Sequence, residues 1–237
     1  MRIMSKLLRT LIVLLLIYSL IVYLISAVAD KATNTQVMEA KLGRFADTQV
    51  TELEKGQYPS LAQAITGFLK GSIDSPQLVV TRGNVRAPAF SEDEIRHLAD
   101  IRGLLQTARM LRYAAIVLVG VALLAYFVLR KSKPALLKAV QPERTLVMGL
   151  LIFLGLILAL VTWGLIDFTG LFTGAHYVIF RNELWMLDPQ KDLLLQLMPL
   201  ELFISYGLDL LKDNAFLLLI LPLAVFGLRG MAKRGGA

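Results

Sequence analysis

The sequence predicts a mainly α membrane protein. It is expected to have four transmembrane helices with both termini inside (N-in/C-in), an extracytoplasmic α+β domain between helices 1 and 2, and an interfacial helix before helix 4. Of its 237 residues, 56% are hydrophobic and 18% are charged, whereas charged residues make up roughly 25% of a soluble domain. Four apolar runs approach the length of about 20 residues that a helix needs to cross the hydrocarbon core. Basic residues lie on alternate connections between these runs.

The four apolar runs cover residues 7–29, 113–129, 145–166 and 214–228. The fourth is short and contains Pro222, which kinks a helix, and it spans if Arg229 snorkels to the interface. The first run begins "MRIMSKLLR" and ends "AVA", which also fits a signal peptide. Its apolar stretch is longer than the usual h-region of about 7–15 residues, so its length favours an uncleaved anchor.

The basic residues predict the orientation of the spans. Arg2, Lys6 and Arg9 precede the first run without an acidic residue, and the connection 130–144 and the tail after residue 228 are similarly basic. The positive-inside rule therefore places these three segments in the cytoplasm. The segments 30–110 and 167–214, which carry ten basic and ten acidic residues and three basic and seven acidic residues respectively, are then outside.

The net charge of +7 is thus an orientation signal, and it does not predict a nucleic-acid-binding surface. The chain has no cysteine, which excludes disulfides, thiolate nucleophiles and cysteine metal ligands. The predicted organisation is as follows: 1–29 transmembrane helix 1, 30–112 extracytoplasmic domain, 113–129 transmembrane helix 2, 130–144 cytoplasmic loop, 145–166 transmembrane helix 3, 167–213 extracytoplasmic loop with the interfacial helix, 214–229 transmembrane helix 4, and 230–237 cytoplasmic tail.

The first outer segment predicts a small mixed domain. Residues 37–56 are mostly compatible with a helix, and a second helix is expected from an N-cap at Ser60 to a stop at Gly71. The stretches "QLVVT" and "VRAPAF" flank Gly83-Asn84 and predict a hairpin. Pro88 makes the second stretch an edge strand, because proline has no N–H to donate to a neighbouring strand.

The end of this segment carries the first candidate for chemistry. In "SEDEIRHLADIRGLLQTARM", Ser91 and Glu94 have the spacing of a capping box, and the helix that follows is expected to continue into the second span. Glu94, His97 and Asp100 are three residues apart and therefore share one helix face. We expect the two carboxylates to raise the pKa of His97 and to fix its tautomer.

The second outer segment begins with "FTGAHYVIFRNELWMLDP", an unusually polar and aromatic connection that contains His176. The leucine-rich stretch after it predicts an amphipathic helix, or two helices broken at Pro199, in the outer interface. Trp185 suits the same depth. His97 lies sixteen residues before the second span and His176 ten residues after the third, so one joint site at the membrane surface is a natural hypothesis.

Two blocks of sequence resemble the lipoprotein intramolecular transacylase (Lit) family of bacterial membrane proteins. They are "FSEDEIRHLADIRGLL" and "AHYVIFRNELWMLDPQKDLLLQLMPLELF", with "ITGFLKG" as a weaker third. Together they cover about a fifth of the chain. The resemblance implies transfer of the sn-2 acyl chain of a lipoprotein's S-diacylglyceryl-cysteine to the α-amino group of that cysteine, which gives a lyso-form lipoprotein. The implied partners are diacylated bacterial lipoproteins and membrane lipid, and the implied location is the outer side of the bacterial cytoplasmic membrane.

The resemblance also implies catalytic roles, with His97 and His176 at the family's two histidine positions. Such a reaction needs a base for the amine and an acid for the leaving glycerol oxygen, and two histidines near neutral pKa would supply both. Asn182 is a candidate oxyanion donor, and Trp185 a candidate contact for the acyl chains. Glu94, Asp100 and Arg181 are candidates for orienting the histidines or the lipid headgroup. A helix over residues 193–211 would border the lipid entrance.

No cofactor or metal is expected, because the histidines lack the i, i+4 spacing of a zinc site. Two other classes of protein stay open on the residues alone. One is a non-enzymatic sensor or assembly subunit with an outer binding domain, in which both histidines tolerate substitution. The other is a metal-dependent membrane hydrolase, which chelators inhibit. The sequence does not indicate the oligomeric state.

Overall fold

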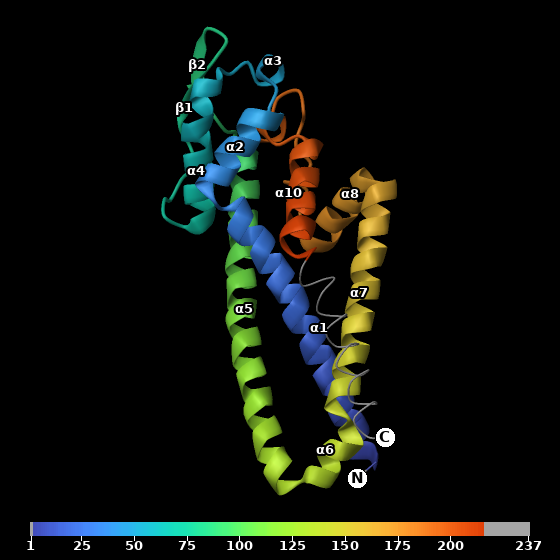
Figure 1. The fold of residues 1–237 in the computed structure, drawn as a ribbon. Coiled ribbons are helices and arrows are strands. Elements are labelled where there is room, and N and C mark those ends of the chain that lie inside the picture. The colour runs from blue at the N-terminus through green and yellow to red at the C-terminus, as the bar shows by residue number, and fades with distance from the viewer. Residues whose placement is uncertain (1, 216–237) are drawn as a thin grey trace. The chain divides into compact units, whose positions relative to one another are not determined.

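The structure is a computed structural model that describes residues 2–215. The chain divides into two compact units, each built from separate stretches of sequence (Figure 1). The described residues of the first, here the helical unit, are 2–26, 109–163 and 210–215. The second, here the mixed unit, comprises Ala27–Ala108 and Gly164–Asp209. Long helices contribute residues to both units.

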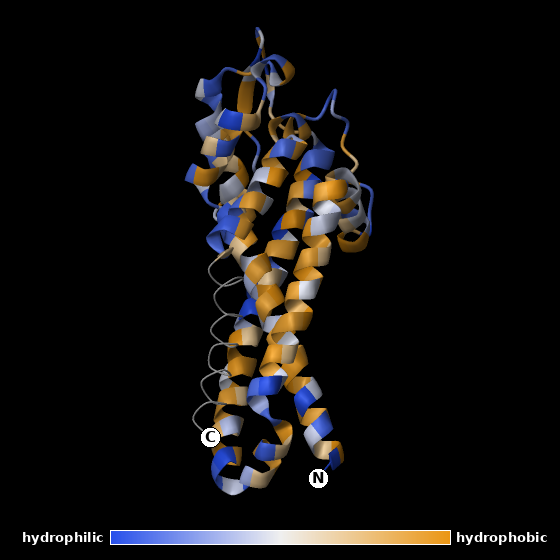
Figure 2. Cartoon of the chain, turned by 45° about the vertical axis from the view of Figure 1, so that its right-hand side comes forward, coloured by the Kyte–Doolittle hydropathy of each residue, from blue (hydrophilic) through white to orange (hydrophobic). Residues whose placement is uncertain are grey.

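The helical unit contains most of the apolar sequence. Its helices are α1 (Arg2–Ala32), α5 (Glu92–Ser132), α6 (Pro134–Val140) and α7 (Pro142–Ile166). Three stretches of the described residues are long and apolar enough to cross a membrane, namely Arg2–Ala32, Glu92–Ser132 and Pro134–Ile166. Their middle turns are coloured as hydrophobic in Figure 2. They contain the first three predicted spans, whereas all but the first two residues of the predicted fourth span lie outside the described residues.

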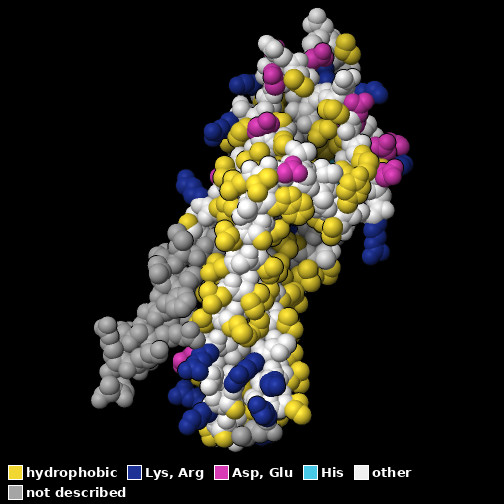
Figure 3. Space-filling view, turned by 90° about the vertical axis from the view of Figure 1, so that its right-hand side faces the viewer, with side chains coloured by type: hydrophobic (Ala, Val, Ile, Leu, Met, Phe, Trp, Pro, Cys, Tyr) yellow, Lys and Arg dark blue, Asp and Glu magenta, His cyan; other side chains and the backbone are white. Residues whose placement is uncertain are grey.

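Close helix contacts define this unit. A Cβ at Gly149 would lie 3.0 Å from a methyl carbon of Leu16, so glycine lets α7 approach α1. The guanidinium of Arg9 donates to the carbonyl oxygens of Ala139 and Val140, the latter at 3.0 Å. Arg9 thereby satisfies carbonyls that the C-terminal end of α6 leaves unpaired. Lys and Arg side chains gather at one end of the helical unit (Figure 3).

The mixed unit combines short helices with one hairpin. Besides the first turns of α5, its elements are α2 (Thr35–Phe45), α3 (Thr48–Thr51), the 3₁₀ helix η1 (Lys55–Gln57), α4 (Tyr58–Lys70), β1 (Val79–Arg82), β2 (Val85–Pro88), α8 (Phe168–Ile179), α9 (Leu193–Leu197) and α10 (Leu200–Asp213). The expected hairpin is confirmed, with β1 antiparallel to β2 and Arg82 paired with Val85. The expected continuation of α5 into the second apolar run is also confirmed.

One predicted helix start is wrong. Helix α4 begins at Tyr58, after Gln57, and not after an N-cap at Ser60. Pro59 lies in the first turn, where a missing N–H costs nothing, because the first helical N–H groups have no partner within the helix. The predicted stop is confirmed, since Gly71 adopts φ +85°, a left-handed conformation that glycine adopts without strain.

The core of the mixed unit explains the leucine-rich segment. Of the two alternatives for this segment, one helix or two broken at Pro199, the structure has the second, because α9 ends at Leu197 and α10 begins at Leu200. The sequence predicts these leucines at the membrane interface, but several of them are buried against protein. The buried apolar residues of the core are Met38, Leu42, Ala46, Leu53, Tyr58, Leu61, Ala62, Ile65, Phe68, Leu69, Val80, Ala89, Phe90, Leu98, Leu193, Leu194, Leu197, Leu202 and Tyr206.

A buried lysine attaches α10 to α2. The ammonium of Lys41 lies 2.7 Å from the hydroxyl of Ser205 and 2.8 Å from a carboxylate oxygen of Asp209. It also lies 4.4 Å from the ring centroid of Tyr206. The hydrogen bond from Lys41 lowers the pKa of Asp209, while burial raises the pKa of Tyr206 to about 12. These contacts satisfy a charge that would otherwise be costly to bury.

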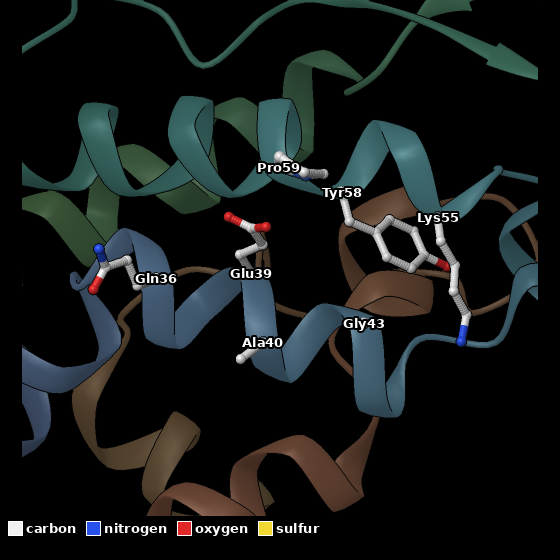
Figure 4. Close-up of a pocket in the computed structure, with 7 residues that line it drawn as sticks. All are labelled: Gln36, Glu39, Ala40, Gly43, Lys55, Tyr58 and Pro59. Atoms are coloured by element: carbon white, nitrogen blue, oxygen red, sulfur yellow. The ribbon is translucent and has the colours of Figure 1, made fainter.

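A groove of about 330 Å³ lies beside α2 and the start of α4 (Figure 4). It is lined by Gln36, Glu39, Ala40, Gly43, Lys55, Tyr58 and Pro59. The groove contains neither histidine, and its two charged side chains have opposite signs. The groove therefore favours neither a cation nor an anion.

Candidate functional site

The first turns of α5 are held firmly in the core of the mixed unit. The predicted capping box is confirmed, with the Ser91 N–H donating to Glu94 at 2.6 Å and the Glu94 N–H to the Ser91 hydroxyl at 3.3 Å. The other oxygen of the Glu94 carboxylate accepts from the N–H of Leu194 at 2.6 Å. Glu94 is 2% exposed. It therefore joins the start of α9 to the start of α5.

The surroundings of Glu94 act on its pKa in opposite directions. Burial raises the pKa of Glu94, and the hydrogen bonds from Leu194 and Ser91 oppose this rise because they favour the ionised form. Both carboxylate oxygens are engaged by backbone N–H groups. The prediction that Glu94 orients His97 directly therefore finds no support in these contacts.

His97 follows one turn later and is 7% exposed. The pKa of His97 is lowered to about 4, mainly by burial and to a lesser degree by nearby His176, while Asp100 acts to raise it. The prediction that flanking carboxylates raise this pKa is wrong, because the cost of burying a charged imidazolium outweighs the attraction of Asp100. Within the described part of the chain, the buried Nδ1 of His97 has no hydrogen-bond partner.

His176 lies on α8, a helix that the sequence analysis treated as a connection. The carboxylate of Asp167 caps this helix, accepting from the N–H of Gly170 at 2.8 Å. The Nδ1 of His176 lies 2.7 Å from the carbonyl oxygen of Phe172. A carbonyl oxygen only accepts, so Nδ1 carries the proton. In the neutral ring, Nε2 is then the nitrogen with the free lone pair.

The structure brings the two histidines together. Their ring centroids are 6.4 Å apart, with an angle of 34° between the ring planes. His97 is neutral at pH 7 because its pKa is about 4. The pair therefore combines a buried neutral imidazole with a second imidazole whose tautomer is set by its own helix.

Aromatic rings surround His176. Phe172 lies 4.2 Å from it, Trp185 5.1 Å and Phe180 5.4 Å, measured between ring centroids. Phe180 also lies 5.1 Å from His97 and so contacts both histidines. The apolar rings lower the local polarity, which strengthens electrostatic interactions within the site.

Sequence analysis missed Phe172 and Phe180, although a signal was present. Phe168, Phe172, His176 and Phe180 recur at every fourth residue, the spacing of one helix face. That spacing would have predicted α8 and its aromatic surroundings. Trp185, proposed to contact acyl chains, packs on His176 and on Tyr177.

The segment after α8 contains the other predicted residues. The side-chain amide of Asn182 donates to Asp100 at 2.8 Å, and its carbonyl oxygen accepts from the N–H of Leu184 at 3.2 Å. Arg181 is exposed and lies outside the aromatic contacts around the histidines. A cavity of about 390 Å³ adjoins this segment, lined by Asp93, Asn182, Glu183, Leu184, Met186, Leu187 and Asp192.

The donor groups of the described residues do not meet the requirements of a metal site with three or more ligands. Among the described residues, no group of three or more His, Asp or Glu side chains is placed so that it could hold a metal ion. The two histidines are accompanied mainly by aromatic rings. Paired imidazoles can act in acid–base or hydrogen-bond chemistry.

The fold and the paired histidines define a class of mainly helical proteins with apolar helices of membrane-spanning length. The chain belongs to the lipoprotein intramolecular transacylase Lit family, whose model matches residues 11–203. The resemblance seen in the two sequence blocks is thereby confirmed.

Solved structures show the same fold. The membrane integral lipoprotein intramolecular transacylase Lit from Bacillus cereus is 18% identical to this chain and has a TM-score of 0.66, with 98% of each chain covered. Two variants of that protein, with a histidine replaced by arginine or by alanine, each have a TM-score of 0.60 at 18% and 17% identity. Between 95% and 98% of each chain is covered in those two comparisons. No curated protein matches the chain in sequence.

Proposed function

We propose that this protein transfers the sn-2 acyl chain of a lipoprotein's S-diacylglyceryl-cysteine to the α-amino group of the same cysteine, and that His97 and His176 carry out the proton transfers and charge stabilisation. The observation that carries the proposal is the pairing of the two histidines, 6.4 Å apart, in a member of the Lit family. Because donor and acceptor are on one molecule, positioning alone supplies much of the rate.

His176 is the proposed base. Its Nδ1 donates to the carbonyl of Phe172, which leaves Nε2 as the nitrogen that takes the proton. The α-amino nitrogen attacks the ester carbonyl carbon and forms a C–N bond, and the amine proton moves to Nε2. The carbonyl oxygen becomes an oxyanion in the tetrahedral intermediate. The hydrogen bond to Phe172 stabilises the resulting imidazolium, because its Nδ1–H remains a donor.

His97 is the proposed hydrogen-bond donor to that oxyanion. With a pKa of about 4 it stays neutral at pH 7, so it donates through an N–H and not as an imidazolium. Its buried Nδ1 has no partner within the described residues, and an unpaired buried nitrogen costs about 1–3 kcal/mol. An oxygen of the substrate would remove that cost if Nδ1 carries the proton.

The second half of the reaction returns the proton. When the intermediate collapses, the bond between the carbonyl carbon and the glycerol oxygen breaks, and that oxygen takes the proton from Nε2 of His176. An ester and an amine thus become an alcohol and an amide, and both histidines are restored. No cofactor or external proton is consumed.

The proposed setting is the bacterial cytoplasmic membrane, with four spans, both termini inside and the site on the outer side. The basic connections support this orientation. So does the contact of Arg9 with the end of α6, which joins two of the basic segments within the helical unit. Bacterial lipoproteins with a diacylglyceryl cysteine are the proposed substrates.

The test is expression in a host whose lipoproteins are diacylated, with the lipoprotein N-terminus read by mass spectrometry. Lyso-form product is expected with the wild-type protein and its loss with His97→Ala or His176→Ala. Glu92→Gln, an exposed position on α5, is the matched control and is expected to retain the product. Product from both histidine variants would reject the proposed pair. If the wild-type protein is present in the membrane and also gives no lyso-form product, the result would favour a sensor or assembly subunit.

A further inference from the structure

The helix that carries His176 has few contacts with the rest of the protein. Within the described residues, α8 contains no buried side chain. The three residues after His176 are exposed, with Tyr177 63%, Val178 85% and Ile179 50% exposed. Helices in proteins are stabilised mainly by burying an apolar face. The contacts that α8 does make with protein are therefore the ones to consider for the placement of His176 beside His97.

Phe172 of α8 packs on Phe203 of α10, with ring centroids 4.8 Å apart, and two further contacts act at the end of α8. One is the ring of Phe180, which packs on both histidines near the end of α8. The other is the hydrogen bond of 2.8 Å between Asn182, two residues further on, and Asp100, one turn after His97 on α5. This bond joins the segment that ends α8 to the helix that carries the other histidine.

The local geometry directs Asn182 toward Asp100. Its carbonyl oxygen accepts from the N–H of Leu184 at 3.2 Å, a turn that Asn side chains form readily. The amide is thereby oriented so that its NH₂ group faces the carboxylate. A hydrogen bond to an ionised acceptor is stronger and shorter than one between neutral groups.

We propose that Asp100 and Asn182 are positioning residues that form a latch between α5 and the end of α8. The closed latch aligns Nε2 of His176 with His97. The inference rests on the proposed function, since it concerns the same site. It replaces the earlier hypothesis that Asn182 donates to the oxyanion.

Exchanging the two residues separates three roles: a latch between Asp100 and Asn182, donation by Asn182 to the oxyanion, and an effect of the charge of Asp100. Asn182→Asp places two carboxylates against each other and breaks the latch. Asp100→Asn removes the charge near His97 but keeps an amide oxygen that accepts from Asn182. The double exchange, Asp100→Asn with Asn182→Asp, restores an amide facing a carboxylate. Glu92→Gln on the same helix is the control.

The readout is the rate of lyso-form production from a diacylated lipopeptide by the purified full chain in detergent. We expect Asn182→Asp to lower kcat by about 10–100-fold, because misplacing a reacting group by about 1 Å costs that much. Asp100→Asn should lower kcat less than fivefold, and the double exchange should recover most of the loss. KM should change little, because the latch aligns the histidines and does not contact the lipid.

Other outcomes would overturn the latch. If Asn182 donates directly to the oxyanion, the double exchange stays as slow as Asn182→Asp, because a carboxylate cannot donate. If Asp100 acts through its charge, Asp100→Asn and the double exchange are both slow. Unchanged rates in all variants would also reject the latch. His176→Ala, measured in parallel, tests the proposed function separately.

A second measurement does not depend on activity. The chain has two tryptophans, so Trp163→Phe leaves Trp185, which packs on His176, as the only one. In that background, Asn182→Asp should shift the emission of Trp185 toward that of an exposed indole, and the double exchange should reverse the shift. If Asn182→Asp leaves the emission of Trp185 unchanged, α8 does not depend on the latch.

Discussion

The two histidines lie on helices that are held in opposite ways. His97 belongs to the first turns of α5, where Glu94 and Leu98 are buried, at 2% and 1% exposed, and the cap is fully paired. His176 belongs to α8, which has no buried side chain among the described residues. The difference indicates a rigid half and an adjustable half of the site. The proposed acyl transfer needs both, because a reaction must be aligned and a large substrate admitted.

The largest expected difference between α5 and α8 is in the free energy of unfolding that is lost when a leucine is replaced by alanine. Leu98→Ala should lower the free energy of unfolding by about 2–5 kcal/mol, because it leaves a cavity in the core. Leu171→Ala on α8, where the leucine is half-buried, should cost less than about 1 kcal/mol. Thermal unfolding in detergent measures both. Equal losses would show that α8 is as firmly packed as α5.

The next effect is the pH dependence of stability. The folded-state pKa of His97 is about 4 and its ordinary value is 6.5. Between these values the unfolded chain binds a proton that the folded chain excludes, so stability falls as pH drops through this window and is fully retained above it. The loss is on the order of 3 kcal/mol. His97→Gln should flatten the profile between pH 6.5 and 4, and an unchanged slope would contradict a buried neutral His97.

A smaller loss is expected at the junction of α5 with α9. Glu94→Gln keeps the shape of the side chain but replaces one accepting oxygen by an NH₂ group. One of the N–H groups of Ser91 and Leu194 then loses its partner, which should cost about 1–3 kcal/mol. Thermal unfolding at pH 7.5 measures this cost, with Glu92→Gln as the exposed control. If the two variants unfold at the same temperature, the junction does not stabilise the fold.

The smallest effect concerns local opening and leaves global stability unchanged. Backbone amides of α8 should exchange hydrogen faster than those in the first turns of α5, because few contacts oppose local opening of α8. Hydrogen exchange of the full chain in detergent, read by mass spectrometry, compares the two helices directly. Similar protection would remove the distinction between a rigid and an adjustable half.

Sequence analysis predicted the features that depend on neighbours along the chain. The capping box at Ser91 and Glu94, the hairpin around Gly83, the stop at Gly71 and the break at Pro199 all follow from local backbone chemistry. The apolar runs follow from the length that a membrane requires. Helix α8 was missed because its apolar residues continue those of α7, and its fourfold spacing of aromatic rings was not interpreted as a helix face.

The tertiary structure decided what each polar group contacts. Glu94 and Asp100 have the same spacing from His97, yet one joins α9 to α5 and the other binds Asn182. The sequence by itself predicted a membrane-type chain with two outer segments, each carrying one histidine. Only the fold decided that the histidines meet and that burial lowers the pKa of His97. Burial and long-range partners arise from segments far apart in the sequence, and residue spacing carries no information about them.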